Sequence, residues 1–303
     1  MTTGRRLQTV ALVVNPASGR QRGEEIARIA QRRMQAVGLQ VRIAHGRGLE
    51  QVRAGLSELL DAGTDTVVVV GGDGALHGVM DLLVAAEATI GLLPAGTGND
   101  TARALGIPVQ DPVAALEIVL AGHRRRIDLA RTGTATGTGA WVTTVVASGF
   151  DSKVNERANT MAWPRGNMRY NIAIAAELRA FSPLAFRLEL DGVTIEREAM
   201  LVAVGNGPSF GGGLRIAEGA VLDDGLLDVC IINPVSKAKL VRVFPRLRTG
   251  THVTLPEFER HLVRRVTLES PGIVAYGDGE RLGPLPTTVE VVPGAMSVLT
   301  PEP

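Results

Sequence analysis

VVVVGGDGALHG, residues 67–78, decides the fold class of this chain, because it runs four valines directly into a glycine-rich turn. Four consecutive β-branched residues fit a strand that is buried on both faces, as in a parallel sheet. The turn GGDG (71–74) needs backbone conformations that glycine adopts more readily than other residues. The stretch therefore predicts a buried parallel strand that ends in a specialised turn.

Short apolar runs and helical segments alternate through the first 130 residues. The expected strands are TVALVV (9–14), LQVRIA (39–44), TVVVV (66–70) and TIGLL (89–93), and the expected helices span 24–37, 49–62 and 75–86. This alternation is typical of βαβ units with a parallel sheet. We therefore expect a doubly wound α/β nucleotide-binding domain, with ligands at the carboxyl ends of its strands.

The pattern changes after IDLA (127–130). A Gly/Thr stretch, RTGTATGTGA, leads into short strand-like runs separated by turn residues, with one helical segment at 167–181. Such runs predict a β-rich sandwich. We place the α/β domain at 1–131 and the β-sandwich domain at 132–293, and we expect residues 294–303 to return to the first domain.

Composition excludes several classes of protein. The chain has 303 residues, of which 45% are hydrophobic, and its formal net charge of +1 carries no global signature of nucleic-acid binding. We therefore expect no nucleic-acid partner. The single cysteine, Cys230, precludes a disulfide framework and is typical of a reducing compartment. No apolar run approaches the roughly 18 residues of a membrane-spanning helix, so we expect a cytoplasmic protein, with peripheral contact at the inner membrane surface left open.

Three glycine-rich turns follow strands of the first domain: NPASGR (15–20), GGDG (71–74) and PAGTGND (94–100). Glycines at helix starts let a phosphate approach the unpaired backbone N–H groups, so several such turns on one rim suggest a polyphosphate. The motifs GxxxxGK[ST] and GxGxxG are both absent. Asp73 would repel a bare phosphate, so it is expected either to act through a metal ion or water, or to cap a helix.

Two acidic turns occur in the second domain, VLDDGLLDV (221–229) and YGDGERL (276–282). Either one alone is a hairpin signal. Together with Asp73, Asp100 and Asp128, they supply carboxylates at turns or strand ends in both halves of the chain. This is the inventory of a metal-assisted phosphoryl transferase, in which one carboxylate accepts a proton from a hydroxyl group.

The motifs taken in order resemble the diacylglycerol-kinase catalytic-domain family of lipid kinases, particularly its soluble bacterial members. The resemblance covers essentially the whole chain and rests on VVNPASGR, VVGGDGALHGVMDLL, GLLPAGTGNDTARALGIP, RRIDLA, VGNGPSFGGGLRIAEGAVLDDGLLDV and YGDGE. The family shares a fold with NAD kinases and phosphofructokinases. It implies an ATP-dependent kinase of a membrane lipid, such as diacylglycerol, with the lipid bound by the β-sandwich domain and the active site in the cleft between the domains.

The resemblance also implies site residues. GGDG would lie under the phosphates of ATP, and Thr97 would contact the nucleotide. Asp278 would be the general base that activates the lipid hydroxyl, with Glu280 supporting it. The full set expected to contact ATP is Asn15, Gly71, Gly72, Asp73, Gly74, Gly96, Thr97, Asn99 and Asp100.

Two magnesium sites are implied in the same way. A structural Mg²⁺ would be held by Asp224 and by the main-chain oxygens of Val221 and Leu226. The carboxylates expected to organise the catalytic Mg²⁺ through water are Asp73, Asp100 and Asp128.

The chain departs from the family after GGDG. The usual Thr, aliphatic, Asn and Glu are replaced by Ala75, Leu76, His77 and Gly78. This leaves the nucleotide preference and the rate open. The alternatives are a kinase of a soluble substrate, such as NAD, on the same fold, and a nucleotide-binding regulator without catalysis.

Residues 237–265 combine eight Lys/Arg with two acidic residues and interleaved apolar residues. This segment is interpreted either as a contact with an anionic membrane surface or as core residues with an ordinary solvated charged face. An exposed strand edge in the second domain could also pair two copies in a homodimer.

Overall fold

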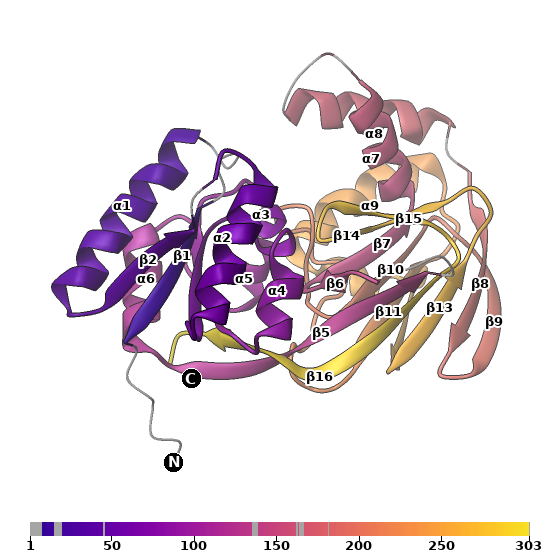
Figure 1. The fold of residues 1–303 in the computed structure, drawn as a ribbon. Coiled ribbons are helices and arrows are strands. Elements are labelled where there is room, and N and C mark those ends of the chain that lie inside the picture. Colours follow the sequence, from indigo (N-terminus) through magenta and orange to yellow (C-terminus); the bar gives the residue numbers. More distant parts are fainter. Residues whose placement is uncertain are drawn as a thin grey trace. The chain divides into compact units, whose positions relative to one another are not determined.

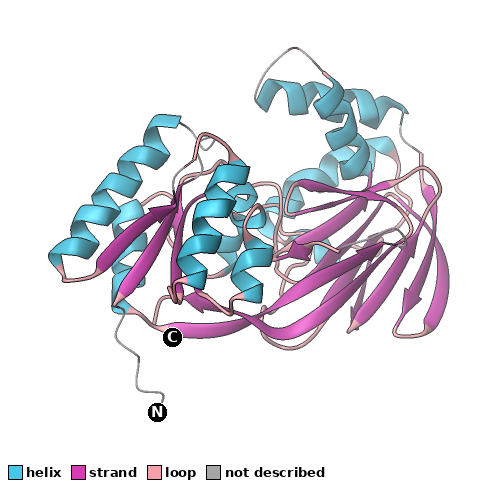
Figure 2. Ribbon diagram, in the orientation of Figure 1, coloured by secondary structure: helices cyan, strands magenta, loops and turns pink. Residues whose placement is uncertain are grey.

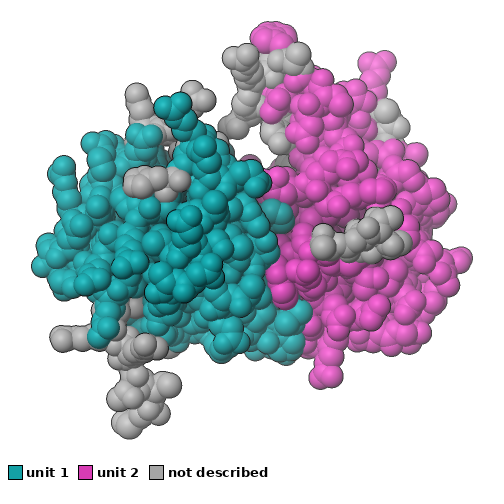
Figure 3. Space-filling view, viewed as in Figure 1, with its two compact units in different colours: residues 1–129, 222–224, 292–303 teal, residues 130–221, 225–291 magenta. Residues whose placement is uncertain are grey.

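The computed structural model describes residues 8–14, 20–44, 46–134, 139–161, 163, 167–180 and 182–302. The chain divides into two compact units, which Figure 3 colours separately. Unit 1 comprises Met1–Leu129, Leu222–Asp224 and Val292–Pro303, and unit 2 comprises Ala130–Val221 and Gly225–Val291. Strands β5 (Arg124–Thr134) and β16 (Thr287–Leu299) each contribute residues to both units.

Unit 1 is built on a parallel sheet that contains the four expected strands. They are β1 (Thr9–Val14), β2 (Gln40–Ala44), β3 (Thr66–Gly71) and β4 (Thr89–Pro94), in the spatial order β2-β1-β3-β4-β16. All six residues of β3 and all six of β4 are buried, which explains their uninterrupted apolar sequences. The strand order reverses between β1 and β3, so the ligand crevice of such a sheet is expected at the carboxyl ends of these two strands.

Six helices in the described part of unit 1 cover both faces of this sheet (Figure 1). Helix α1 contacts α6, and α2 contacts α4. Their bounds are α1 (Arg20–Ala36), α2 (Leu49–Asp61), α3 (Asp73–His77), α4 (Met80–Ala85), α5 (Asp100–Ala104) and α6 (Pro112–Ala121).

The segment expected as one helix over 75–86 forms two helices, α3 and α4. The break follows α3 at Gly78, whose carbonyl oxygen accepts a hydrogen bond from Arg53 Nη1 at 2.6 Å. The Arg53 guanidinium also pairs with the carboxylate of Asp81 through contacts of 2.7 Å. The tertiary contact with Arg53 therefore stabilises a helix end that the apolar pattern does not show.

Unit 2 contains two sheets that face each other (Figure 2). The six-stranded sheet is antiparallel, in the order β12 (Phe258–Val263), β11 (Leu227–Ile232), β10 (Leu201–Gly205), β7 (Val145–Gly149), β14 (Val274–Gly277) and β15 (Glu280–Pro284). The second sheet contains β8 (Leu184–Leu190), β9 (Val193–Ala199), β13 (Arg265–Glu269) and part of β16, with β5 and the short β6 (Trp141–Val142) alongside.

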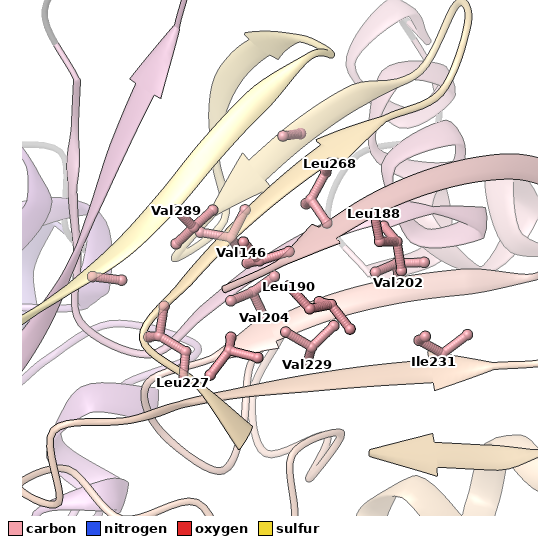
Figure 4. Packing of buried hydrophobic residues seen from close by; sticks show 14 of the residues in the cluster. Val146, Leu188, Leu190, Val202, Val204, Leu227, Val229, Ile231, Leu268 and Val289 are labelled. Carbon is pink, nitrogen blue, oxygen red and sulfur yellow. The ribbon is translucent and has the colours of Figure 1, made fainter. Parts of the chain in front are cut away.

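An apolar core fills the space between these sheets. Val146, Val202 and Val229 of the six-stranded sheet pack in one cluster with Leu188 and Leu268 of the other (Figure 4). The structure thus confirms the expected fold class, a parallel α/β domain followed by a β-rich sandwich.

A helical layer covers the other face of the six-stranded sheet. It consists of α7 (Phe150–Thr160), α8 (Asn167–Ala180) and α9 (Lys237–Thr249), followed by the 3₁₀ turn η1 (Thr251–Thr254) (Figure 1). Residues from α7, α8 and α9 share one cluster with Val145, Ala147 and Ala203. Only α8 was expected from the sequence. Within the described ranges, no helix is both long and apolar enough to cross a membrane.

Asp151, in the first turn of α7, is an unusual carboxylate in this layer. Both of its side-chain oxygens are buried, and the nearby N–H groups of Ser152 and Asp151 are the only described donors that act on them, without the geometry of full hydrogen bonds. Burial raises the pKa of Asp151 to about 7, although the N–H groups of Ser152 and Asp151 offset part of the shift. The protein therefore carries a carboxyl group that is neutral when folded at mildly acidic pH.

Because of this raised pKa, we expect the neutral substitution Asp151→Asn to increase the stability of the folded protein by an amount that depends on pH. Between about pH 4 and pH 7 the folded state retains a proton that the unfolded state releases, so wild-type stability falls as pH rises through this window. At pH 8 the variant should be more stable by up to about 4 kcal/mol, and at pH 4 the two proteins should be equal. Thermal unfolding at both pH values tests this, and equal melting temperatures at pH 8 would contradict it.

Candidate active site

Two glycine-rich turns of unit 1 touch each other backbone to backbone. A Cβ atom on Gly96 would lie 2.5 Å from the Cα atom of Gly72, and one on Gly72 would lie 2.9 Å from the Cα atom of Gly96. The N–H group of Ala95 also donates to the carbonyl oxygen of Gly71 at 2.9 Å. The glycines of GGDG and GTGND are therefore required by the close approach of the two turns after β3 and β4.

The carboxylate of Asp73 joins the same two turns. Its Oδ2 accepts a hydrogen bond from the N–H group of Asp100, and its Oδ1 accepts one from the N–H group of Thr101, both at 2.9 Å. Asp73 therefore does cap a helix, but that helix is α5, which follows GTGND, rather than its own helix α3. The two glycine-rich turns form one connected structure through this side chain.

Asn99 fixes the shape of the second turn. Its φ of 55° lies in the left-handed region. Its Oδ1 accepts a hydrogen bond from the N–H group of Gly96 at 3.0 Å, and its Nδ2 donates one to the carbonyl oxygen of Gly96 at 2.8 Å. Asn99 is buried, whereas Thr97 and Gly74 are exposed at the surface of the two turns. The turns thus have a buried, hydrogen-bonded side and an exposed side that a ligand can reach.

A cavity of about 10 Å³ lies beneath the turns, lined by Gly72, Asp73, Asn99 and Thr101 among others. This volume is enough for about one water molecule. A nucleotide would therefore have to lie against the exposed surface of the turns rather than within this cavity.

The close contact between the two turns predicts that a side chain at Gly96 destabilises them. Gly96→Ala should destabilise unit 1 by about 1–3 kcal/mol, because the new methyl group must push the turns apart, and it should weaken MgATP binding. Gly48→Ala is the matched control, since a Cβ atom there meets no atom within 4 Å. Thermal unfolding with and without MgATP measures both effects. Equal melting temperatures and equal ATP-induced shifts in the two variants would contradict the role given to the contact.

The other carboxylates expected around the catalytic metal are buried. Asp100 lies beside Asp73, and its Oδ1 is 3.9 Å from Arg103 Nε. Asp128 on β5 accepts a hydrogen bond from the N–H group of Gly294 at 2.7 Å. Among the described residues, no group of three or more His, Cys, Asp or Glu side chains is arranged to hold a metal ion. The structure therefore brings the main chain of Asp100 to the Asp73 carboxylate, and among the described residues Asp128 does not complete a metal-binding cluster with them.

The loop expected to hold the structural metal has one acidic side chain already engaged. Arg125 binds Asp223 through two contacts of 2.9 and 2.7 Å, and these lower the pKa of Asp223. The neighbouring Asp224 is exposed, as is Val221, and Leu226 is half-buried. Asp223 and Asp224 are therefore both accessible at the surface of this loop.

In unit 2, the YGDGE segment forms the tight hairpin between β14 and β15. Asp278 and Gly279 have φ values of 50° and 89°, so both central residues are left-handed, as in a type I′ turn. The expected Asp-Gly hairpin is present, with Gly277 paired to Glu280 across it.

The carboxylate of Asp278 accepts four hydrogen bonds within this unit. Thr143 donates to Oδ2 from its N–H group at 2.7 Å and its hydroxyl at 2.9 Å. Thr144 donates to Oδ1 from its N–H group at 2.9 Å and its hydroxyl at 2.6 Å. Two donors at each oxygen fill the lone pairs of this carboxylate and hold the side chain in place. Asp278 therefore anchors the hairpin to the segment before β7.

Glu280 differs from Asp278 in its surroundings. It is exposed at the first position of β15. The next residue, Arg281, donates from Nε to Glu156 Oε1 on α7 at 2.9 Å, and Tyr276 donates its hydroxyl to the same oxygen at 2.5 Å. These contacts lower the pKa of Glu156, and burial together with Glu156 raises the pKa of Tyr276 to about 12. Glu156 thus holds both strands of the hairpin while Glu280 stays at the surface.

Three residues of this site were not singled out in the sequence. Besides Thr143 and Thr144, the buried Asn206 donates from Nδ2 to the carbonyl oxygen of Thr143 at 2.9 Å. The available signals were the adjacent hydroxyl residues in WVTTVV and the polar residue in VGNGP. Both fall in runs that read as ordinary strands and turns. Asn15, which was expected to contact the nucleotide, lies outside the described residues.

Comparisons with known proteins cover both units. The family model for the diacylglycerol kinase catalytic domain matches residues 9–132, and the model for the YegS C-terminal NAD kinase beta sandwich-like domain matches residues 144–300. A diacylglycerol kinase of Mycobacterium tuberculosis (strain ATCC 25618 / H37Rv) is 42% identical over 293 residues, which span 96% of this chain and 95% of the relative.

More distant proteins are also similar to this chain over most of its length. A protein of Stenotrophomonas maltophilia (strain K279a) named "Probable lipid kinase YegS-like" is 29% identical over 279 residues, with 89% of each chain covered. A crystal structure of a diacylglycerol kinase from Bacillus anthracis has the same fold, with a TM-score of 0.71, 19% identity and 98% of each chain covered.

Proposed function

This chain belongs to the diacylglycerol kinase catalytic-domain family of lipid kinases, which are phosphotransferases, and on that premise we propose that it transfers the γ-phosphate of ATP to a hydroxyl group of a membrane lipid of the diacylglycerol type. The observation that carries the proposal is the structure in which Asp73 locks GGDG to GTGND. Its exposed surface, with glycine on both turns, fits the close approach of a polyphosphate to backbone N–H groups.

Carboxylate oxygens in the same place fit a divalent cation. Asp73 and Asp100 supply hard oxygen donors. Each Asp73 oxygen accepts one N–H hydrogen bond from the described residues, which leaves a second lone pair on that oxygen for a cation. In this proposal Asp73 and Asp100 hold the catalytic Mg²⁺, directly or through water, and Asp128, which forms no metal-binding cluster with them among the described residues, would act on the ion through water only. The chemistry that Mg²⁺ supplies when bound is neutralisation of the charge on the transferring phosphoryl group.

A second Mg²⁺ is proposed at the loop 221–226. Asp224 would hold it together with the main-chain oxygens of Val221 and Leu226. Support comes from the exposure of Asp224 and Val221 and the half-buried position of Leu226 on this loop. A mixed set of carboxylate and main-chain oxygens suits such a cation.

The DGE hairpin supplies the proton acceptor. We assign this role to Glu280 and assign the positioning of the hairpin to Asp278, which exchanges the roles implied by the resemblance. The reason is that four hydrogen bonds occupy the Asp278 carboxylate, whereas Glu280 is exposed. The lipid hydroxyl oxygen would bond to the γ-phosphorus, its proton would pass to Glu280, and the bond from the γ-phosphorus to the oxygen of the leaving ADP would break.

Acceptor-dependent ADP formation tests the proposed function. With MgATP in mixed micelles, ADP should form when diacylglycerol is included and should stay at the background rate in micelles without it. NAD in place of lipid tests the soluble-substrate alternative on the same fold. ADP formation that depends on NAD and not on any lipid would overturn the proposed acceptor.

A further inference from the structure

The helical layer of unit 2 leaves a stripe of large apolar side chains exposed. Trp163 is 78% exposed, Met168 is 58% exposed and Ile172 is 42% exposed. Trp163 has the highest exposure of the large apolar residues in the described part of the chain. Along α8, Met168, Ile172 and Ala175 follow one another at steps of four and three residues, so they share one face of the helix. The α8 residues therefore form one continuous apolar face, and Trp163 precedes this helix in the chain.

The opposite side of α8 is held against the protein. Ala173 is fully buried in the cluster that also contains Val154 and Ala158 of α7. Glu177 is buried and accepts a hydrogen bond from Arg157 Nε on α7 at 2.5 Å. Helices α7 and α8 lie side by side (Figure 1). These contacts fix the rotation of α8, so the apolar stripe faces away from unit 2.

Helix α9 adds a cationic surface to the same layer. Val243 and Leu247 are buried, and Leu247 packs in the cluster that α7 and α8 share. The other side of α9 exposes Val241, Arg242, Arg246 and Arg248. None of these three arginines forms an ion pair with any residue that the structure describes.

The acidic residues of this layer do not cancel that charge. Asp151 has both oxygens buried, and Glu156 pairs with Arg281. Glu177 pairs with Arg157, and Glu257, which follows η1, pairs with Lys239. The helical layer therefore exposes arginines on α9 and apolar side chains on α8.

We propose that the layer α7–α9 is the face with which the protein binds an anionic lipid bilayer. Trp163, Met168 and Ile172 enter the boundary between headgroups and acyl chains, where indole rings are favoured, and the α9 arginines contact the anionic headgroups. This inference rests on the proposed function, because an enzyme whose acceptor stays in the bilayer has to work at its surface. It assigns the lipid contact to α8 and α9 rather than to the whole segment 237–265, in which Arg260 and Arg265 pair with Asp228 and Glu290.

Tryptophan fluorescence gives a direct test on the full chain. The protein has two tryptophans, and Trp141→Phe leaves Trp163 as the single reporter. In this background, vesicles of phosphatidylcholine with phosphatidylglycerol should shift the Trp163 emission to the blue, and phosphatidylcholine vesicles alone should do so much less. Bound protein with an unchanged Trp163 spectrum would overturn the insertion of α8.

Vesicle co-sedimentation with matched variants separates the two parts of the face. Met168→Ser with Ile172→Ser should weaken binding by about tenfold, and Val193→Ser, at an exposed position on β9, should leave it unchanged. Serine at Arg242, Arg246 and Arg248 should weaken binding to anionic vesicles by about 100-fold, since each cation near the surface contributes about fivefold. Serine at the exposed residues Arg32, Arg124 and Arg264 removes the same charge elsewhere and should have little effect.

These measurements need no nucleotide, so they test the membrane-binding face independently of the proposed kinase activity. Binding through this face without phosphate transfer to any lipid would overturn the kinase assignment alone. Phosphorylation of micellar lipid with no vesicle binding, or with equal loss in variants and controls, would overturn this face alone. Self-association in solution that is lost in the Met168/Ile172 variant would make a second copy of the chain the occupant and would also overturn it.

Discussion

Replacing Glu280 by glutamine should lower phosphate transfer to lipid by a factor of about 100 or more while leaving the melting temperature unchanged. The amide keeps the size of the side chain and removes its ability to accept the hydroxyl proton. Because Glu280 is exposed, its substitution removes no packing. Turnover at saturating MgATP and thermal unfolding measure the two effects. Glu198→Gln, at an exposed position on β9 in the same unit, is the matched control and should keep full activity.

Asp278→Asn, unlike Glu280→Gln, should lower the stability of the protein. An amide cannot accept hydrogen bonds at both of its terminal atoms, so the donors of Thr143 or Thr144 lose their acceptor. The expected cost is on the order of 1–3 kcal/mol, and activity should fall with the loss of the hairpin's position. If the Asp278 variant is inactive at unchanged stability and the Glu280 variant is active, the proton acceptor is Asp278.

Asp73→Asn should have the second large effect, a loss of turnover of about 100-fold or more together with weaker MgATP binding. The carboxylate holds the N–H groups of Asp100 and Thr101 with separate oxygens, and an amide can hold one of them. The start of α5 should also lose about 1–2 kcal/mol of stability. Turnover, ATP affinity and thermal unfolding together distinguish a loss of site geometry from global unfolding.

Asp111→Asn is the matched control for the Asp73 variant. Asp111 caps α6 in the same unit, and its Oδ1 accepts from both Val113 and Ala114 at 3.0 Å, so the amide oxygen can keep both bonds. Turnover in this variant should be unchanged. If Asp73→Asn also retains wild-type turnover and ATP affinity, Asp73 is a helix cap with no part in the reaction.

The strands of unit 1 could be predicted from the sequence because burial on both faces leaves a strong local signal. TVVVVG and TIGLLP are apolar throughout, and both are fully buried in β3 and β4. The break between α3 and α4 could not be predicted in this way. It depends on Arg53, which reaches the Gly78 carbonyl from another helix 25 residues earlier in the chain.

The helical layer of unit 2 was only partly visible in the sequence. Helix α9 carries Pro245 in its interior, which argues locally against a helix. Its end signals were nevertheless present. Ser236 caps it by accepting from the Lys239 N–H group at 3.2 Å, and Gly250 ends it with a φ of 73°.

The candidate site likewise has features that the sequence predicts and features that only the structure shows. The glycine-rich turns and the DGE hairpin are local motifs, so their positions could be read from the chain. The roles of Asp73 and Asp278 depend on partners 27 to 135 residues away, and spacing alone does not reveal these partners. The capping of α5 by Asp73 and the four bonds to Asp278 therefore required the structure.

Transfer of labelled γ-phosphate from MgATP to a lipid panel, with the lipid products separated, tests the central claim most directly. The panel should contain diacylglycerol, monoacylglycerol, phosphatidylglycerol and a long-chain base, with NAD and a no-lipid sample alongside. The proposed function predicts label in a lipid, strongest for a diacylglycerol-type acceptor, and loss of that label with Glu280→Gln. Label in NAD alone, or no transfer by a folded protein that binds MgATP, would contradict it.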